Sequence, residues 1–207
     1  LGLETAGYKL LVDPYFTGNP AASTTADEVK PDYIFLSHGH FDHVGDVVSI
    51  ARRCGATVIT NHEIANWLEN QGIQTHGQHI GGGHQHPFGY LKFTLALHGS
   101  GLPDGSDGGN PVGFLLTTLD GKNIYCSCDT GLFSDMRLIG ETGLNLAVLP
   151  IGDNFTMGPE DALRAVKLLQ PQHVIPTHYN TWDLIQQDAQ AWRRRVESEI
   201  HTLEPQP

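Results

Sequence analysis

The sequence has few cysteines, few cations and no long apolar run. Three cysteines among 207 residues do not suit a disulfide scaffold, so we expect a reducing compartment, the cytoplasm. Twelve Lys and Arg against 23 Asp and Glu give a net charge of −11, which argues against a nucleic-acid-binding surface and against docking on an anionic membrane. No apolar run approaches the length of a membrane span, and no signal-peptide pattern is seen.

Histidine, in contrast, is abundant, with 12 residues in this acidic chain. Histidine is the commonest metal ligand and the usual acid or base near neutral pH. The function therefore depends on whether these histidines are organised into a site.

Short apolar segments alternate with amphipathic ones along the chain, and we expect a single domain, residues 1–207. The segments predicted to be strands are 9–12, 33–37, 57–60, 91–97, 112–118, 123–128, 146–151 and 174–177. Helices are predicted at 44–54, 63–70, 159–170 and 184–199. This alternation indicates an α/β sandwich. Two Gly-rich segments, 79–89 and 99–110, are expected to be long loops, either lids over an active site or disordered segments.

The densest group of candidate ligands is the run from His38 to His43, between a predicted strand and a predicted helix. In an extended segment His38 and His40 point the same way, so they can chelate one ion. Asp42 and His43 lie around the bend and can serve a second ion. Packing gives a chain no reason to crowd imidazoles and a carboxylate together, which favours a metal site over a His-rich surface loop.

Three more candidate ligands, His98, Asp129 and His178, each follow an apolar strand. Taken singly, each is equally well explained as a polar residue with ordinary hydrogen-bond partners. Ligands from strand ends at one edge of a sandwich can converge on one site, and the mixed nitrogen and oxygen set suits zinc, manganese or iron.

The order of these residues resembles the metallo-β-lactamase superfamily. A His-x-His-x-Asp-His run is followed by a single His, a single Asp and a final His. The finer resemblance is to uncharacterised metal-dependent hydrolases akin to L-ascorbate-6-phosphate lactonase. The segments that carry it, spread over nearly the whole chain, are 12–14, 17–20, 37–46, 96–98, 129–133, 149–158 and 175–181.

The resemblance implies a four-layer αββα sandwich with two divalent ions, zinc before manganese or iron. It implies a first ion on His38, His40 and His98. A second ion would be held by Asp42, His43 and His178, with Asp129 bridging both. A hydroxide between the ions would be the nucleophile. Asp42, Asp129 and His178 are accordingly expected to be catalytic. The implied reaction is hydrolysis of a phosphodiester or lactone-type ester in a small anionic substrate.

Substrate contacts are expected from two loops. Asp153, Asn154 and Thr156 precede the helix that begins at Pro159, and a helix N-terminus favours an anionic group. The alternative is a plain capping loop with Thr156 as the cap. The resemblance further implies that Tyr179 and Asn180 orient the substrate, and that Asp13 accepts a hydrogen bond from a ligand histidine.

The chain departs from the pattern in two places. It begins at Leu1, and by the resemblance we expect the first strand of such proteins, with its Gly-His turn, to be missing from the sequence. Cys126-Ser127-Cys128 also stands before Asp129, where relatives usually have His-Ala-Gly. Cys126 and Cys128 are expected to share one strand face. The alternatives for them are a soft metal ligand, a redox-sensitive pair or small core residues, and packing is favoured.

The other seven histidines are expected to be bystanders. Those in the first Gly-rich segment, His79, His84 and His86, are expected to be exposed, with the pocket edge as the alternative. His62, His76, His173 and His201 receive no functional role. Competing interpretations of the whole chain are a metal-binding or redox-sensing protein with little hydrolytic activity, and a β-lactam hydrolase. No exposed apolar stripe demands a dimer, and a homo-oligomer stays an open alternative.

Overall fold

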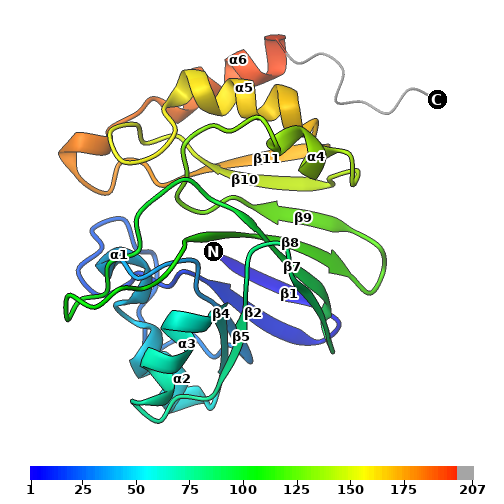
Figure 1. Ribbon diagram of the computed structural model, residues 1–207. Coiled ribbons are helices and arrows are strands. Elements are labelled where there is room, and N and C mark those ends of the chain that lie inside the picture. The colour runs from blue at the N-terminus through cyan, green and yellow to red at the C-terminus, as the bar shows by residue number, and fades with distance from the viewer. Residues whose placement is uncertain (200–207) are drawn as a thin grey trace.

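A computed structural model of the chain describes residues 1–199. Two β-sheets lie face to face, and helices cover the outer face of each sheet (Figure 1). His201 and the end of the predicted single domain lie outside the described residues. Within residues 1–199, no helix is long and apolar enough to cross a membrane.

The five-stranded sheet has the order β1-β2-β3-β4-β5. Its strands are β1 (Gly2–Thr5), β2 (Tyr8–Val12), β3 (Tyr33–Phe35), β4 (Thr57–Asn61) and β5 (Thr75–Gln78). β1 and β2 are antiparallel, and the other neighbours are parallel. The short helix α1 (Phe41–Val44) follows β3, and α2 (Val47–Cys54) and α3 (His62–Glu69) cover the outer face of this sheet (Figure 1).

The six-stranded sheet has the order β11-β10-β9-β8-β7-β6. Its strands are β6 (Gly83–His86), β7 (Gly89–Leu95), β8 (Val112–Thr118), β9 (Asn123–Cys126), β10 (Leu146–Pro150) and β11 (His173–Thr177). β9, β10 and β11 are parallel, whereas β6 to β9 are antiparallel neighbours. The helices beside this sheet are α4 (Met136–Gly140), α5 (Pro159–Leu169) and α6 (Ala189–Glu199), with a 3₁₀ turn, η1 (Asp183–Ile185), before α6.

Alternation along the strands builds the layers, because successive side chains of a strand point to opposite faces. Leu10 and Val12 of β2 pack between the two sheets, while Leu11 packs under α2 and α3. In β10, Val148 packs between the sheets and Leu149 packs under α5. Three hydrophobic clusters therefore separate four layers, and the expected αββα sandwich is confirmed.

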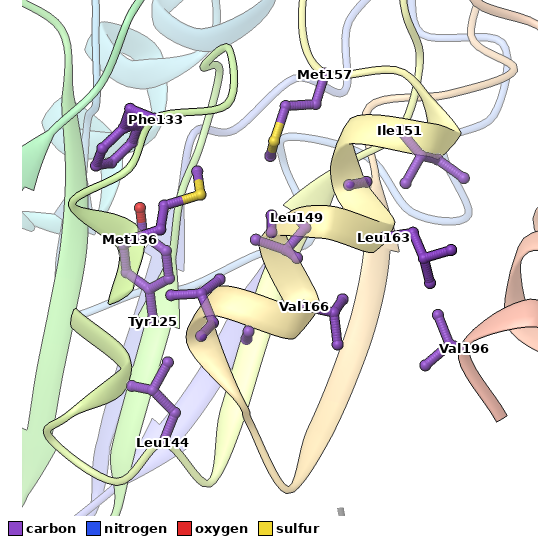
Figure 2. Close-up of a cluster of buried hydrophobic side chains, with 14 of the residues drawn as sticks. Tyr125, Phe133, Met136, Leu144, Leu149, Ile151, Met157, Leu163, Val166 and Val196 are labelled. Atoms are coloured by element: carbon purple, nitrogen blue, oxygen red, sulfur yellow. The ribbon is translucent and has the colours of Figure 1, made fainter. Parts of the chain in front are cut away.

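The outer cluster on the six-stranded sheet shows how a helix is fixed to it. Pro159 occupies the first turn of α5, where its missing N–H costs nothing. Figure 2 shows Leu163 and Val166 of α5 near Leu149 of β10, with Val196 of α6 beside Leu163. This packing anchors the loops before α5 and after β11.

The structure corrects several sequence expectations. It contains β1, β5, β6 and α4, which were not predicted, and β6 lies inside the segment expected to be a loop, 79–89. The residues of β6, Gly-His-Gln-His, have no apolar alternation, and pairing with β7 holds them in a strand. The predicted helix 44–54 begins later, as α2 at Val47, and the short helix α1 ends at Val44 before it. The predicted helix 184–199 is η1 followed by α6.

Candidate metal centre

The candidate ligands lie just beyond the C-terminal ends of strands. β2 and β3 run parallel in one sheet, and β7, β9 and β11 share a direction in the other, so within each sheet these ends meet at one edge. Six candidate residues follow these strands: Asp13, His38, His40, His98, Asp129 and His178. Asp42 and His43 are supplied by α1, directly after His40. The structure brings all eight side chains together.

Three imidazoles form the first group: His38, His40 and His98. Nε2 of His38 lies 3.0 Å from Nδ1 of His40, and Nε2 of His98 lies 3.2 Å from the same Nδ1 atom. With zinc–nitrogen bonds of 2.0–2.1 Å, two nitrogens on a tetrahedral ion lie about 3.3 Å apart. The spacing of these ring nitrogens is therefore that of a metal site.

The second group contains two carboxylates and two imidazoles: Asp42, His43, Asp129 and His178. Oδ2 of Asp42 lies 3.4 Å from Nε2 of His43 and 3.4 Å from Nε2 of His178. Nε2 of His43 is buried and makes no hydrogen bond of good geometry, although two carboxylate oxygens lie within 3.4 Å. A buried ring nitrogen left without a partner and facing carboxylates fits a divalent ion as the missing partner.

A single oxygen of Asp129 joins the two groups. Its Oδ2 atom lies 3.1 Å from Nε2 of His178 and 3.3 Å from Nε2 of His43. The same atom lies 3.5 Å from Nε2 of His98 in the first group. This is the placement that a carboxylate bridging two ions requires.

Asp13 and Ser37 hold two of the imidazoles from behind. Oδ2 of Asp13 contacts Nδ1 of His43 at 3.0 Å and accepts a hydrogen bond of 2.6 Å from the Ser37 hydroxyl. That hydroxyl lies 2.8 Å from Nδ1 of His38, so its oxygen accepts a hydrogen bond from Nδ1–H and the lone pair of the His38 ring lies on Nε2. Sequence reasoning missed Ser37, although its place directly before the histidine run was a usable signal.

Several residues at the strand ends have left-handed backbone conformations, with φ of 44° at Asp13, 51° at Cys128 and 52° at His178. For a residue with a Cβ this costs about 1–2 kcal/mol and persists only when surrounding structure enforces it. At His178 this surrounding structure includes Gly152. The two backbones pack so closely that a Cβ atom added to Gly152 would overlap the His178 carbonyl oxygen. Packing thus fixes the direction in which the His178 side chain leaves β11.

Without a bound metal ion, the imidazoles of the second group hold protons and its carboxylates hold negative charge. Burial alone would raise the pKa of Asp129, but His43 and His178 outweigh it and hold that pKa well below its usual range. Burial lowers the pKa of His178, yet Asp129 and Asp42 outweigh it and raise the value to about 9. Burial and His43 lower the pKa of His38 to about 3, so the His38 imidazole is neutral. A metal ion that binds to the second group would therefore have to displace protons from it.

The two cysteines near Asp129 are unpaired. β9 ends at Cys126, and Cys128 is left-handed, so the expectation that they share one strand face is wrong. Burial raises the pKa of Cys126 to about 12 and that of Cys128 well above its usual value. Thiols that stay protonated are poor ligands and poor redox centres. The structure therefore favours packing for both residues.

A cavity of about 500 Å³ opens onto both metal-ligand groups. It is lined by His40, Phe41, Asp42, His98, Asp129, Phe155, His178 and Trp182. Phe41 is 62% exposed and Phe155 is 48% exposed, and Trp182 contacts Phe41 with ring centroids 6.2 Å apart. No Lys or Arg is among the described residues that line it. Sequence reasoning assigned no role to these aromatic side chains. Phe41 lies directly after His40, and Trp182 lies four residues after His178, so proximity to a candidate ligand was a usable signal.

The five residues expected to contact substrate lie outside this cavity: Asp153, Asn154, Thr156, Tyr179 and Asn180. The amide of Asn180 instead bonds to the backbone of Gln187 through both its oxygen and its nitrogen. Tyr179 packs against the cluster under α5. Thr156 is not the helix cap, because Gly158 occupies that position.

Comparisons with known proteins agree with this geometry. Residues 8–179 match the family described as the β-lactamase superfamily domain. The chain therefore belongs to the metallo-β-lactamase superfamily, and the two relatives that follow, 48% and 47% identical, place it among the UPF0173 metal-dependent hydrolases. A UPF0173 metal-dependent hydrolase of Heliobacterium modesticaldum is 48% identical over 98% of this chain and 90% of the relative. One from Thermus thermophilus is 47% identical over 95% of this chain and 88% of the relative.

A solved structure is also similar to this chain in sequence and in fold. Igni18, a metallo hydrolase of the archaeon Ignicoccus hospitalis, is 38% identical and superposes with a TM-score of 0.88. The match covers 96% of this chain and 86% of Igni18. The four-layer architecture seen here is thus also that of an experimentally determined structure.

Proposed function

We propose that the protein binds two divalent metal ions and uses them to hydrolyse a phosphodiester or a lactone-type ester in a small anionic substrate. The observation that carries this proposal is the position of the Asp129 carboxylate, with one oxygen within 3.5 Å of ring nitrogens from both ligand groups. His38, His40 and His98 would hold one ion, and Asp42, His43 and His178 the other. The donor set suits zinc first and manganese or iron as alternatives.

When bound, two such ions lower the pKa of a water molecule between them and polarise the scissile carbonyl or phosphoryl group. The residues of the chain supply position and protonation state. Ser37 keeps the His38 lone pair on Nε2, and Asp13 orients His43. Asp42, Asp129 and His178 border the cavity together with His40 and His98, so these five ligands would face a bound substrate.

The cavity lining supports a particular kind of substrate. With no Lys or Arg among its described lining residues, the metal ions would be the main partners for negative charge at the reacting group. Phe41, Phe155 and Trp182 can pack against an apolar remainder of the substrate. We therefore propose a small molecule that is anionic or carbonyl-containing at the scissile bond and apolar beside it.

Two alternatives predict different behaviour. A redox-sensing protein with little hydrolytic activity would need a reactive thiol near the centre, and burial of Cys126 and Cys128 counts against one. A β-lactam hydrolase rests on the fold alone. The unpaired state of all three cysteines supports the proposal of a reducing compartment, the cytoplasm.

The test is a substrate panel with protein loaded in turn with zinc, manganese and iron. The panel is bis(p-nitrophenyl) phosphate, a series of lactones and nitrocefin. We expect turnover of the phosphodiester or of lactones, and a loss in His40→Ala that exceeds the ~10- to 100-fold typical for partners outside the ligand set. His173→Ala is the matched control, because His173 is exposed on β11 and belongs to no candidate ligand group.

Two results would contradict the proposal. Fully metal-loaded protein that turns over no member of the panel would favour the metal-binding alternative. Hydrolysis that survives unchanged in His40→Ala would place the activity elsewhere in the protein.

A further inference from the structure

A second group of histidines lies on the edge strands of the two sheets. β5 is the last strand of the five-stranded sheet and β6 is the last strand of the six-stranded sheet. The chain passes from one to the other through only residues 79–82. Side chains of these two edge strands can therefore meet across the boundary between the sheets.

Three imidazoles meet there: His76 of β5 and His84 and His86 of β6. Their ring centroids are 4.5 Å apart for His76–His84, 4.9 Å for His76–His86 and 4.7 Å for His84–His86. One ring nitrogen of each lies within 4.8 Å of the others. His84 and His86 are two residues apart on a strand and so share a face.

His86 is held in place. It is only 8% exposed, its ring stacks on Phe88 with an interplanar angle of 4°, and its Nε2 lies 3.3 Å from Oε1 of Gln78. A hydrogen bond from one ring nitrogen to an amide oxygen fixes the tautomer and leaves Nδ1 to carry the lone pair. This outer partner resembles those found behind metal-bound histidines.

The other two imidazoles, of His76 and His84, are open to solvent, and their side chains can adjust to a metal ion. His76 is partly buried and His84 is exposed, so the group is open to solvent. Nitrogens on a tetrahedral zinc ion lie about 3.3 Å apart, and a rotation of the exposed His84 side chain can close a gap of this size. The group is thus close to coordination geometry without any backbone movement.

The chemistry of the group selects a class of ion. Burial and the two neighbouring imidazoles lower the pKa of His86 to about 4, and burial and His84 lower that of His76. At neutral pH protons therefore compete little with a metal ion for the rings of His76 and His86. The group contains no carboxylate. Three imidazole nitrogens suit zinc, nickel or copper, and do not suit magnesium or calcium.

We propose that His76, His84 and His86 form a separate mononuclear site for a divalent transition metal. The ion cross-links β5 to β6 and so ties the edges of the two sheets together, with water or another small ligand in the remaining coordination position. The site shares no residue with the centre around Asp129. Its role is to stabilise the boundary between the sheets.

The test measures zinc stoichiometry and thermal stability of the whole protein. Metal-free wild type, His84→Gln and His76→Gln/His84→Gln are dialysed against Zn²⁺, and bound zinc is counted by mass spectrometry. His79→Gln is the matched control, because His79 lies in the same segment, is exposed and is outside the group of three. His84 is exposed, so its replacement leaves folding intact, which circular dichroism verifies.

We expect the double variant to bind one zinc ion fewer than wild type and His79→Gln. We also expect His84→Gln to bind that ion at least 10-fold more weakly, and zinc to raise the melting temperature less in both variants. Because the readout is a difference between variants, it is independent of how many ions the Asp129 centre holds. Equal stoichiometry and equal zinc-induced stabilisation in all four proteins would overturn the proposal.

Discussion

Oδ2 of Asp129 lies 3.1 Å from Nε2 of His178, although the two residues are 49 positions apart and follow strands separated by β10. Asp129 follows the C-terminal end of β9, and His178 follows β11 directly. The left-handed backbone of His178 directs its side chain toward Asp129. The contact is possible because these parallel strands end at the same edge of the sheet. It joins the one carboxylate shared by both ligand groups to the last ligand in the chain.

Replacing Asp13 is expected to weaken metal binding without removing a ligand. Asn at position 13 loses the negative charge that faces Nδ1 of His43 at 3.0 Å and that accepts the Ser37 hydroxyl. Loss of such partners typically costs ~10- to 100-fold in metal affinity or activity. We expect a loss in that range for Asp13→Asn, measured as the zinc dissociation constant by competition with a chelator.

The matched control is Asp32→Asn, since Asp32 also accepts a backbone hydrogen bond, from Lys9, but is exposed. Wild-type zinc affinity in Asp13→Asn would show that the carboxylate does not orient the ligand histidines.

The stability of the metal-free protein is expected to fall as pH rises from about 6.5 to about 9. The folded state raises the pKa of His178 from 6.5 to about 9, so it binds this proton more tightly than the unfolded chain does. The stabilisation is complete below pH 6.5 and is lost as the pH rises through about 9. The measurement is the melting temperature of metal-free protein at several pH values.

Two comparisons isolate this effect. In Asp129→Asn the main partner of His178 is gone, and the fall in melting temperature over this range is expected to shrink. In zinc-loaded protein the fall in melting temperature is also expected to shrink, because metal ions replace the protons. A metal-free melting temperature that stays constant or rises between pH 6.5 and 9 would contradict the assignment.

The aromatic side chains of the cavity are expected to affect substrate binding and leave metal binding unchanged. Trp182→Ala removes a ring that lines the cavity and contacts Phe41. A lost aromatic contact is worth about 1 kcal/mol, roughly a fivefold rise in KM for a substrate with an aryl group. Leu138→Ala, at an exposed position of α4 that does not line the cavity, is the control. An unchanged KM for aryl substrates would remove the aromatic rings from the substrate site.

Gly152→Ala is expected to disturb His178 through its backbone. The added Cβ would overlap the His178 carbonyl oxygen and press on Ile185. Overpacking of this kind costs about 1–3 kcal/mol in the free energy of unfolding, measured by denaturant titration. We also expect weaker metal binding. Gly101→Ala is the control, because its Cβ would meet no atom within 4 Å. Equal stability of the two variants would mean that the chain relaxes freely around position 152.

That the candidate ligands lie close together was predictable from the sequence, because most of them follow the ends of strands. The run from His38 to His43 is dense enough to be recognised alone, and His98, Asp129 and His178 each follow an apolar strand. The layers were predictable for a similar reason, since alternation in strands such as β2 marks both faces of a sheet.

What the sequence did not reveal depends on contacts between distant segments. β6 has no apolar pattern and exists because β7 pairs with it, so the meeting of His76 with His84 and His86 could not be read from their spacing. His86 was expected to be exposed and is buried, because its ring stacks on Phe88. The loop before α5 was expected to offer Asp153, but Phe155 is the residue that lines the cavity.

The most direct test of the central claim is an anomalous-difference map from crystals of the zinc-loaded protein. The account predicts two peaks at this centre, one bonded to His38, His40 and His98 and the other to Asp42, His43 and His178. It also predicts that the Asp129 carboxylate is bonded to both. A single peak at this centre, or two peaks without a shared Asp129, would contradict the account.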